Sequence, residues 1–284
     1  MTLMVTRRRE ALRTLLASPN TVRPATVFDP LSIRLAEEAG FQLAMLPGSI
    51  ASMAMLGAPD CLLISQSELV DLCRRIAVAS NLPLMVDADH GFGNSLNVWR
   101  TVQELDRAGL AGISIEDTEL PAPLGSKKSS LISQAEAAAK IKAAVQGRLD
   151  PQTVIIARTD LSAVPLEDSL ERVRLFEAAG ADAVFLAQAK SEEQIQRVAE
   201  ACTLPLMLGP SAASMAGSEL LVSCRVRVIL TGHAPFLAAL EGAREAYEAQ
   251  VNPESAEMPK LLPSNLLTQL TKEAELAELV KQDT

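Results

Sequence analysis

The 284-residue chain contains few cysteines and few histidines, and both are scattered along it. No Cys-x-x-Cys pair occurs among its four cysteines, which are Cys61, Cys73, Cys202 and Cys224. This usage is typical of a reduced cytoplasmic protein, in which cysteines serve as small buried apolar side chains. The two histidines, His90 and His233, are too far apart in sequence to indicate a zinc site.

The chain has fewer basic than acidic residues. Lysine and arginine number 26 against 35 aspartates and glutamates, which gives a net charge of −9. Because nucleic-acid binding relies on a basic face, we expect no nucleic-acid partner. The chain also has no Gly-x-Gly-x-x-Gly sequence after its first predicted strand and no Walker glycine–lysine loop. These absences disfavour a nucleotide-binding sheet.

Long uninterrupted hydrophobic runs are missing too. The longest uncharged stretch covers residues 39–59, and it is broken by Pro47, Gly48, Gly57 and Pro59. It therefore does not predict a membrane span. The first 13 residues are rich in arginine and lack the apolar segment of a secretory signal. We therefore expect no membrane partner and a cytoplasmic location.

The chain does contain a balanced globular composition and a recurring local pattern. It is 48% apolar and 21% charged, and its length suits a single (β/α)8 barrel, which takes roughly 250 residues. Three helical patterns end in a glycine that is followed by an apolar run, at Gly40, Gly109 and Gly180. Glycine ends a helix in the left-handed conformation, and a continuous apolar run suits a strand buried on both faces. The pattern therefore indicates a parallel α/β array.

Eight short apolar runs rich in valine, isoleucine and leucine predict the strands, at residues 25–28, 41–46, 82–86, 110–115, 154–157, 181–186, 205–208 and 226–230. Helical periodicity lies between them, at residues 69–79, 98–108, 135–145, 166–178 and 192–201. This alternation predicts an α/β fold, a (β/α)8 TIM barrel, with residues 1–284 forming one domain. Residues 252–284 would form a C-terminal helical extension, with an amphipathic helix at 261–280 that we expect to pack on a neighbouring subunit.

Acidic residues follow several of these strands, where barrels of this kind place their active sites. Asp87 and Asp89 come directly after the third predicted strand, and their spacing would place both side chains on one face. Two such carboxylates repel each other unless a cation lies between them, and oxygen ligands favour Mg²⁺ or Mn²⁺. Glu116 and Asp60 would add carboxylates through water. The alternative is that these acids cap the following helices.

Arg158 follows the fifth predicted strand. A guanidinium in the mouth of a barrel needs an anion, and a substrate carboxylate would supply bidentate hydrogen bonds. The alternative is an internal ion pair with Glu116 or Asp117.

Two further positions end strands with polar groups. Gly48 and Ser49 follow the second strand and would offer a carboxylate a cradle of N–H and O–H donors, although a simple turn would have the same sequence. His233 follows the eighth strand. It would either hydrogen-bond a substrate oxygen or serve as a structural histidine.

With these residues the chain resembles the isocitrate lyase/phosphoenolpyruvate mutase superfamily over nearly its whole length. The most specific match is Asp87-Ala88-Asp89-His90-Gly91-Phe92-Gly93-Asn94, with Pro47-Gly48-Ser49 before it and Ile115-Glu116-Asp117 after it. The resemblance implies a (β/α)8 barrel whose terminal helix is swapped between subunits. It also implies a homotetramer, as a dimer of helix-swapped dimers, and a small 2-oxo dicarboxylic acid as substrate.

The resemblance implies a metal site. Asp87 would bind Mg²⁺ directly, with Mn²⁺ as a substitute, and Asp60, Asp89 and Glu116 would surround its water ligands.

The resemblance also implies how the substrate is held. Gly48 and Ser49 would bind its C1 carboxylate, while Arg158 and His233 would bind other substrate oxygens. The catalytic residues would then be Asp87, Arg158 and His233.

Departures from the family pattern favour one branch of the family. Its carbon–carbon lyases carry a Lys-Lys/Arg-Cys-Gly-His loop whose thiol acts as acid and base, but this chain reads Gly125-Ser126-Lys127-Lys128-Ser129-Ser130 there. It also lacks the Lys-x-Asn-Ser loop of the phosphonate branch, and after the seventh strand it has Leu208-Gly209-Pro210-Ser211 where lyases place an asparagine. The chain is most similar to the oxaloacetate decarboxylase branch. Lys127 and Lys128 would close over an acidic substrate or lie in a solvated loop.

The predicted function is Mg²⁺-dependent decarboxylation of oxaloacetate to pyruvate and CO₂ through a metal-stabilised enolate. A β-keto acid that loses CO₂ needs no nucleophile, but it needs an electron sink at the adjacent carbonyl, and a divalent metal supplies one. Two alternatives stay open. One is a carbon–carbon lyase acting on a 2-alkylmalate or methylisocitrate-like substrate, and the other is a non-catalytic barrel that binds a 2-oxo acid.

Overall fold

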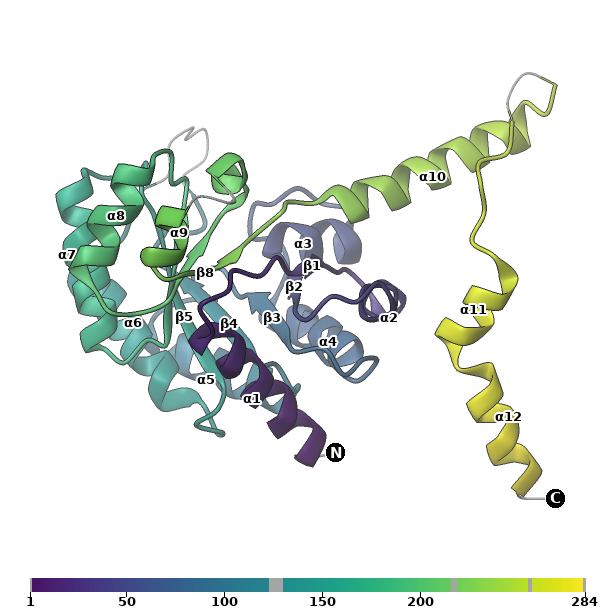
Figure 1. Cartoon of the computed structure of the whole chain (residues 1–284), viewed down its shortest axis with the longest axis horizontal. Helices are drawn as coiled ribbons and strands as arrows, with labels where there is room; N and C mark the ends of the chain where they lie inside the picture. The colour runs from purple at the N-terminus through teal and green to yellow at the C-terminus, as the bar shows by residue number, and fades with distance from the viewer. Residues whose placement is uncertain (1, 123–129, 216–218, 255–256, 283–284) are drawn as a thin grey trace.

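The computed structural model describes residues 2–122, 130–215, 219–254 and 257–282, and a sheet of eight parallel strands lies at its centre (Figure 1). The strands follow each other around the sheet in chain order, so each pairs with the next along the sequence. They are β1 (Ala25–Thr26), β2 (Ala44–Leu46), β3 (Leu84–Asp87), β4 (Gly112–Glu116), β5 (Val154–Asp160), β6 (Ala183–Ala187), β7 (Leu206–Leu208) and β8 (Val226–Ile229).

The sheet curls until its last strand meets the chain that enters the first. Val22 forms a parallel bridge with Val228 of β8, and its N–H donates to the Arg227 carbonyl at 2.8 Å. The Val22 carbonyl in turn accepts from the N–H of Ile229 at 3.1 Å. The predicted α/β fold with eight parallel strands is therefore confirmed as a (β/α)8 barrel.

Helices connect the strands on the outside of the barrel (Figure 1). In the described parts of the chain they include α2 (Pro30–Glu38), α3 (Gly48–Leu56), α4 (Gln66–Ala77), α5 (Ser95–Arg107), α6 (Gln134–Gly147), α7 (Leu166–Ala178), α8 (Glu192–Ala201) and α9 (Glu219–Ser223). The three glycines that were predicted to end helices have φ angles of +85° at Gly40, +92° at Gly109 and +93° at Gly180. This is the left-handed conformation that only glycine adopts without strain.

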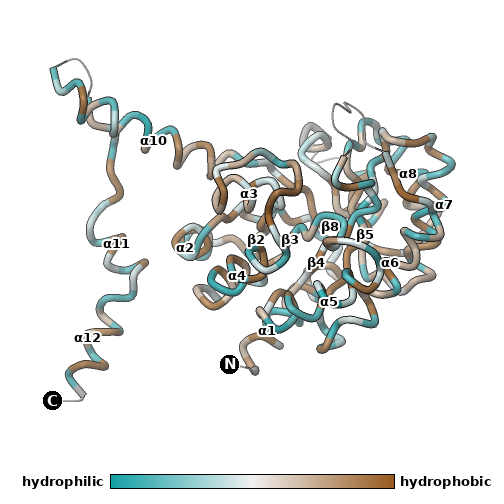
Figure 2. The backbone as a smooth tube through the Cα atoms, turned by 180° about the vertical axis from the view of Figure 1, so that it is seen from behind, coloured by the Kyte–Doolittle hydropathy of each residue, from teal (hydrophilic) through white to brown (hydrophobic). Residues whose placement is uncertain are grey.

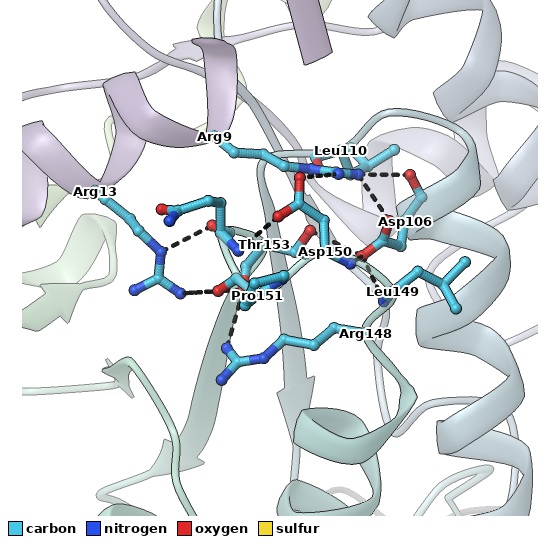
Figure 3. Close-up of polar contacts among 10 residues, drawn as sticks. Arg9, Arg13, Asp106, Leu110, Arg148, Leu149, Asp150, Pro151 and Thr153 are labelled. Carbon is cyan, nitrogen blue, oxygen red and sulfur yellow. Dashed lines mark hydrogen bonds and ion pairs between the residues drawn. The ribbon is translucent and has the colours of Figure 1, made fainter. Parts of the chain in front are cut away.

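The amino end of the barrel is closed by α1 (Thr2–Ala17), a helix that the sequence patterns did not predict. Its Leu12 and Leu16 are buried with the inward-facing residues of the strands. Arg9, also on α1, donates to the Leu110 carbonyl at 3.1 Å and pairs with Asp106 and Asp150 at 2.9 and 2.7 Å (Figure 3). This buried polar network fastens α1 across the amino end, which leaves the carboxyl ends of the strands as the open mouth.

The C-terminal chain first leaves the barrel and then returns to it, since Arg34 of α2 donates to the Leu270 carbonyl at 2.6 Å. Helix α10 (Ala234–Val251) projects outward with Leu237, Leu240 and Tyr247 exposed, and hydrophobic stretches continue along the chain that follows (Figure 2). The single helix predicted at 261–280 is wrong. It is two helices, α11 (Ser264–Thr271) and α12 (Glu273–Gln282), because Lys272 between them has a φ of +58°.

The remaining differences from the sequence predictions are local. The first strand is shorter than predicted, since β1 ends at Thr26. Three of the four cysteines are buried, as expected, but Cys61 is exposed. Among the described residues, no helix has the length and apolar character needed to cross a bilayer.

Candidate active site

A pocket of about 220 Å³ opens at the carboxyl ends of the strands. Five of the predicted site residues line it: Ser49, Asp60, Asp87, Arg158 and His233. Apolar side chains from β2, β6 and the segments after β7 and β8 form the rest of its wall, including Met45, Phe185, Pro210 and Leu230. The pocket therefore brings together residues that are up to 184 positions apart in sequence.

Two acidic side chains are delivered to the mouth by neighbouring strands. Asp87 ends β3 and Glu116 ends β4, and each is 7% exposed. Asp89 lies in the loop after β3 with a φ of +47°, and its carbonyl accepts from the N–H of Glu116 at 2.8 Å. The left-handed turn at Asp89 therefore folds the loop back against the end of β4.

Arg158 lies between the acids. It is directly opposite Glu116 in the β4–β5 register, and its Nε lies 3.1 Å from a Glu116 oxygen, while its Nη1 donates to Asp87. Its guanidinium also stacks on Phe185, 5.2 Å from the ring centre. Burial disfavours the charged arginine, but the charges of Asp87 and Glu116 outweigh burial and raise its pKa. The ion pair with Glu116 that the sequence left open is thus formed.

The other acid named in that alternative has a different partner. The Asp117 carboxylate pairs with Arg172 at 3.1 Å and accepts from the Thr159 hydroxyl at 3.0 Å. Asp117 contributes only its backbone N–H to Arg158, donating to the Arg158 carbonyl at 3.2 Å.

Four carboxyl groups act electrostatically on Arg158 and form an acidic cluster around it: Asp60, Asp87, Asp89 and Glu116. A single guanidinium cannot neutralise four carboxylates. Burial, together with repulsion from Asp87 and Glu116, raises the pKa of Asp89 to about 8. Burial is also the main cause that raises the pKa of Glu116 to about 7, and it raises the pKa of Asp60. Carboxylates crowded in this way favour an added cation, because a cation removes both the repulsion and the unpaired charge.

A divalent ion fits these residues in one particular way. The Oδ1 atom of Asp87 is buried and has no hydrogen-bond partner, so it keeps a free lone pair beside the pocket. No three acidic, histidine or cysteine side chains in the described parts of the chain converge closely enough to form a metal site. A site here would therefore resemble the usual Mg²⁺ arrangement, in which one or two carboxylates bind the ion and water fills its other positions.

The start of α3 forms another part of the pocket wall, through Ser49. This helix begins at Gly48, directly after β2, and Pro47 before it offers no side-chain cap, so the first N–H groups of the helix lack a capping acceptor. The Ser49 hydroxyl lies 3.2 Å from Nε2 of His233, and Nδ1 of His233 is buried without a partner. A helix amino end with a hydroxyl and an imidazole beside it attracts an anion.

Gly48 itself meets a carboxylate of the protein. A Cβ atom added at Gly48 would lie 2.6 Å from Oδ1 of Asp89. Gly48, Asp89 and Glu116 are not among the residues that line the pocket. The close approach that the sequence indicated at Gly48 is therefore made by Asp89.

Comparisons with known proteins show the family of the chain. Residues 12–251 match the family model described as phosphoenolpyruvate phosphomutase. The chain belongs to this family. It is 46% identical over 271 residues to a protein named oxaloacetate decarboxylase from Bradyrhizobium sp. (strain BTAi1), covering 95% of this chain and 94% of that one. A protein of the same name from Rhodopseudomonas palustris (strain BisB18) is 45% identical, with coverage of 97% and 95%.

Solved structures of the family have the same fold. Oxaloacetate acetylhydrolase in complex with the inhibitor 3,3-difluorooxalacetate superposes with a TM-score of 0.84 at 25% identity, covering 98% of this chain and 97% of that one. Phosphonopyruvate hydrolase in complex with oxalate and Mg²⁺ gives a TM-score of 0.82 at 26% identity, with coverage of 96% and 97%. These proteins are similar in fold to this chain over nearly its full length.

Some site features of this family member were not found from its sequence. Phe185 under Arg158 reads as an ordinary core residue of a strand, and Pro210 as a turn residue, so neither carries a sequence signal for a pocket. Lys127 and Lys128, for which closure over the substrate and a solvated loop were both left open, lie outside the described residues.

The contact between Gly48 and Asp89 allows a direct test. Replacing Gly48 with alanine is expected to push the Asp89 carboxylate away, because the new methyl group would lie inside the van der Waals distance of its oxygen. We expect weaker Mn²⁺ binding, measured by electron paramagnetic resonance, together with lower activity. Gly242→Ala on α10 is the matched control, since nothing lies within 4 Å of the added methyl group. Equal metal affinity in Gly48→Ala and Gly242→Ala would contradict the contact.

Proposed function

We propose that this protein catalyses the Mg²⁺-dependent decarboxylation of oxaloacetate to pyruvate and CO₂. The observation that carries the proposal is the pocket in which Asp87, with a free buried oxygen, faces Arg158 and the Ser49–His233 pair. Relatives at about 45% identity that bear the name oxaloacetate decarboxylase support the same reaction.

The residues around Asp87 would hold the metal. Asp87 would bind Mg²⁺ through its free oxygen, and Asp60, Asp89 and Glu116 would accept hydrogen bonds from its water ligands. Mn²⁺ would substitute, because it prefers similar oxygen ligands. When bound, the metal would supply a Lewis acid that draws electron density toward the C2 carbonyl oxygen of the substrate.

The protein's own donors would hold the substrate. Ser49 and the uncapped amino end of α3 would bind the C1 carboxylate, with the N–H groups and the hydroxyl donating to its oxygens. Gly48 would contribute its backbone N–H, while the space that a side chain there would need is taken by the Asp89 carboxylate. Arg158 and His233 would bind other substrate oxygens, and the stacking of Arg158 on Phe185 limits the directions in which its guanidinium can turn.

The reaction itself needs little beyond this arrangement. The C3–C4 bond breaks, its electron pair moves toward C3 and the C2 oxygen, and C4 leaves as CO₂. A proton from water then reaches C3 and gives pyruvate. Among the described residues that line the pocket there is no cysteine, which agrees with a reaction that needs no thiol acid.

A substrate panel tests the function. Purified protein with Mg²⁺ is incubated with oxaloacetate, a 2-alkylmalate or methylisocitrate, and the organic acids are separated and quantified. We expect pyruvate as the only organic product, and only from oxaloacetate. Release of a second acid, such as succinate, would identify a carbon–carbon lyase instead. Binding of oxalate without turnover of any substrate would identify a barrel that only binds 2-oxo acids.

We also propose that the protein forms a homotetramer from helix-swapped dimers. Helix α10 leaves its own barrel, and a mostly apolar groove of about 300 Å³ lies between α2 and the start of α10, lined by Phe28, Leu35 and Phe41 among others. A second copy's C-terminal helices would cover this groove.

The assembly is tested by light scattering after gel filtration. Charging the apolar face of α10 with Leu237→Asp and Leu240→Asp should produce smaller species, whereas Leu149→Asp, another exposed leucine, should not. A wild-type chain that runs as a monomer would rule the assembly out. That the protein works in the cytoplasm stays a prediction from its sequence.

A further inference from the structure

A buried lysine lies behind the acidic cluster. Lys140, on α6, is only 3% exposed, although lysine is almost never buried unless its charge is paired. Its ammonium group donates to the backbone carbonyl of His90 at 3.1 Å. Lys140 does not line the pocket and has no place in the mechanism above, so its burial needs another explanation.

The carbonyls of three consecutive residues, Asp89, His90 and Gly91, each accept a hydrogen bond from another element, and Lys140 binds the middle one. The Asp89 carbonyl accepts from the N–H of Glu116 at 2.8 Å, and the Gly91 carbonyl accepts from the hydroxyl of Thr101 at 3.1 Å. The loop after β3 is thus tied at successive residues to β4, α6 and α5.

This loop needs such fastening because its backbone is unusual. Asp89 and Phe92 adopt left-handed conformations, with φ angles of +47° and +63°, which disfavour residues with a side chain. Without external hydrogen bonds the loop would relax to a commoner conformation. Asp89 would then leave its place beside Gly48, and the end of β3 that bears Asp87 would lose its support.

The charge of Lys140 also suits its place. Glu136, Glu116 and Asp117 act on its ammonium electrostatically and favour its charged form, against the burial that lowers its pKa. His90 beside it is kept neutral at pH 7, because burial and the lysine charge lower the pKa of His90 to about 4. Lys140 therefore brings a positive charge to the rear of the carboxylates from a helix that does not reach the pocket.

We propose that Lys140 is a positioning residue for the carboxylate site: its ammonium fixes the loop at residues 88–91 and stabilises the charged carboxylates in front of it. The inference rests on the metal site of the proposed function. It does not depend on which substrate the protein turns over.

Two variants of Lys140 separate its hydrogen bond from its charge. Lys140→Met removes both, and Lys140→Gln keeps an N–H donor, on a side chain one bond shorter, but no charge. Arg9→Met is the control, since Arg9 is also a buried cation that donates to backbone carbonyls but lies at the other end of the barrel. Arg9→Met is expected to lower stability without altering the site.

The first readout uses the protein without metal. Hydrogen exchange at the amides of Ala88 and Gly91, which donate to Ser114 and Ala88, is expected to speed up in Lys140→Met and to stay unchanged in Arg9→Met. The second readout is the Mn²⁺ dissociation constant, measured by electron paramagnetic resonance. We expect it to rise about 10- to 100-fold in Lys140→Met, as for other residues that support metal ligands, and by a smaller factor in Lys140→Gln.

The outcomes for the lysine variants either support or overturn the role of Lys140. Faster exchange at the loop and weaker Mn²⁺ binding in the lysine variants, with neither change in Arg9→Met, would support the proposal. Wild-type Mn²⁺ affinity in Lys140→Met, or in Lys140→Gln should Lys140→Met not fold, would overturn it. A wild-type protein that binds Mn²⁺ but makes no pyruvate would refute the proposed function and leave this inference standing.

Discussion

Replacing Asp87 with alanine is expected to remove metal-dependent decarboxylation entirely, leaving only the rate that free Mg²⁺ gives. Asp87 ends β3 with one oxygen bonded to Arg158 and the other free and buried. Asp89 and Glu116 do not line the pocket, and Asp60, which does line it, is exposed and has no buried free oxygen like that of Asp87. The measurement is the rate of pyruvate formation at saturating Mg²⁺, together with Mn²⁺ binding to the purified variant.

Asp160→Ala is the control for this variant. Asp160 also ends a strand at the mouth of the barrel, but its carboxylate accepts from the N–H and hydroxyl of Ser162 and does not line the pocket. It is expected to retain activity and metal affinity. Full Mg²⁺-dependent activity in Asp87→Ala would contradict the assignment of Asp87 as the metal ligand.

Replacing Arg158 with alanine is expected to have two opposite effects. The KM for oxaloacetate should rise about 10- to 100-fold, because a charge-assisted hydrogen bond contributes roughly 1.5–3 kcal/mol. Mn²⁺ binding without substrate should become tighter, since Arg158 is itself a cation that holds Asp87 and Glu116. A metal ion has to compete with this guanidinium for Asp87, and the variant removes the competitor.

Arg158→Lys separates these effects. It keeps the competing charge but loses the planar, bidentate donor, so KM should rise while Mn²⁺ affinity stays near that of the wild type. Steady-state kinetics and metal titration of both variants give the comparison. An unchanged KM in Arg158→Ala would refute the role of Arg158 in binding the substrate, and weaker metal binding would refute the competition.

The two effects together suggest how metal and substrate cooperate. Arg158 neutralises part of the acidic cluster through its ion pairs with Asp87 and Glu116. If a divalent ion neutralised Asp87 instead, the guanidinium would be free to turn toward a substrate carboxylate. Metal binding would then prepare the pocket for its substrate, because it would release Arg158 from its ion pair with Asp87.

Local signals in the sequence were sufficient to predict the barrel. The glycines at positions 40, 109 and 180 end helices as predicted, since a left-handed residue there is a property of the local chain. The same is true of the strand ends: polar residues after apolar runs meet at one end of a parallel barrel, so Ser49, Asp87, Arg158 and His233 were found before any contact was known.

Features that depend on distant partners could not be predicted. Helix α1 buries Arg9 against Asp106 and Asp150, which are 97 and 141 positions away, and its charged sequence gives no sign of this. Lys140 is likewise buried with its ammonium donating a hydrogen bond to the His90 carbonyl, which lies 50 positions earlier. The approach of Asp89 to Gly48 follows from a left-handed turn that no residue pattern identifies.

The central claim is tested most directly by measuring pyruvate formation from oxaloacetate with the purified wild-type protein. The assay contains Mg²⁺ and is repeated with excess EDTA and then with Mg²⁺ restored, and the rate with Mg²⁺ alone is subtracted each time. The account predicts a rate well above that of free Mg²⁺, lost with EDTA and recovered when the metal returns. A rate no higher than that of free Mg²⁺ would contradict it.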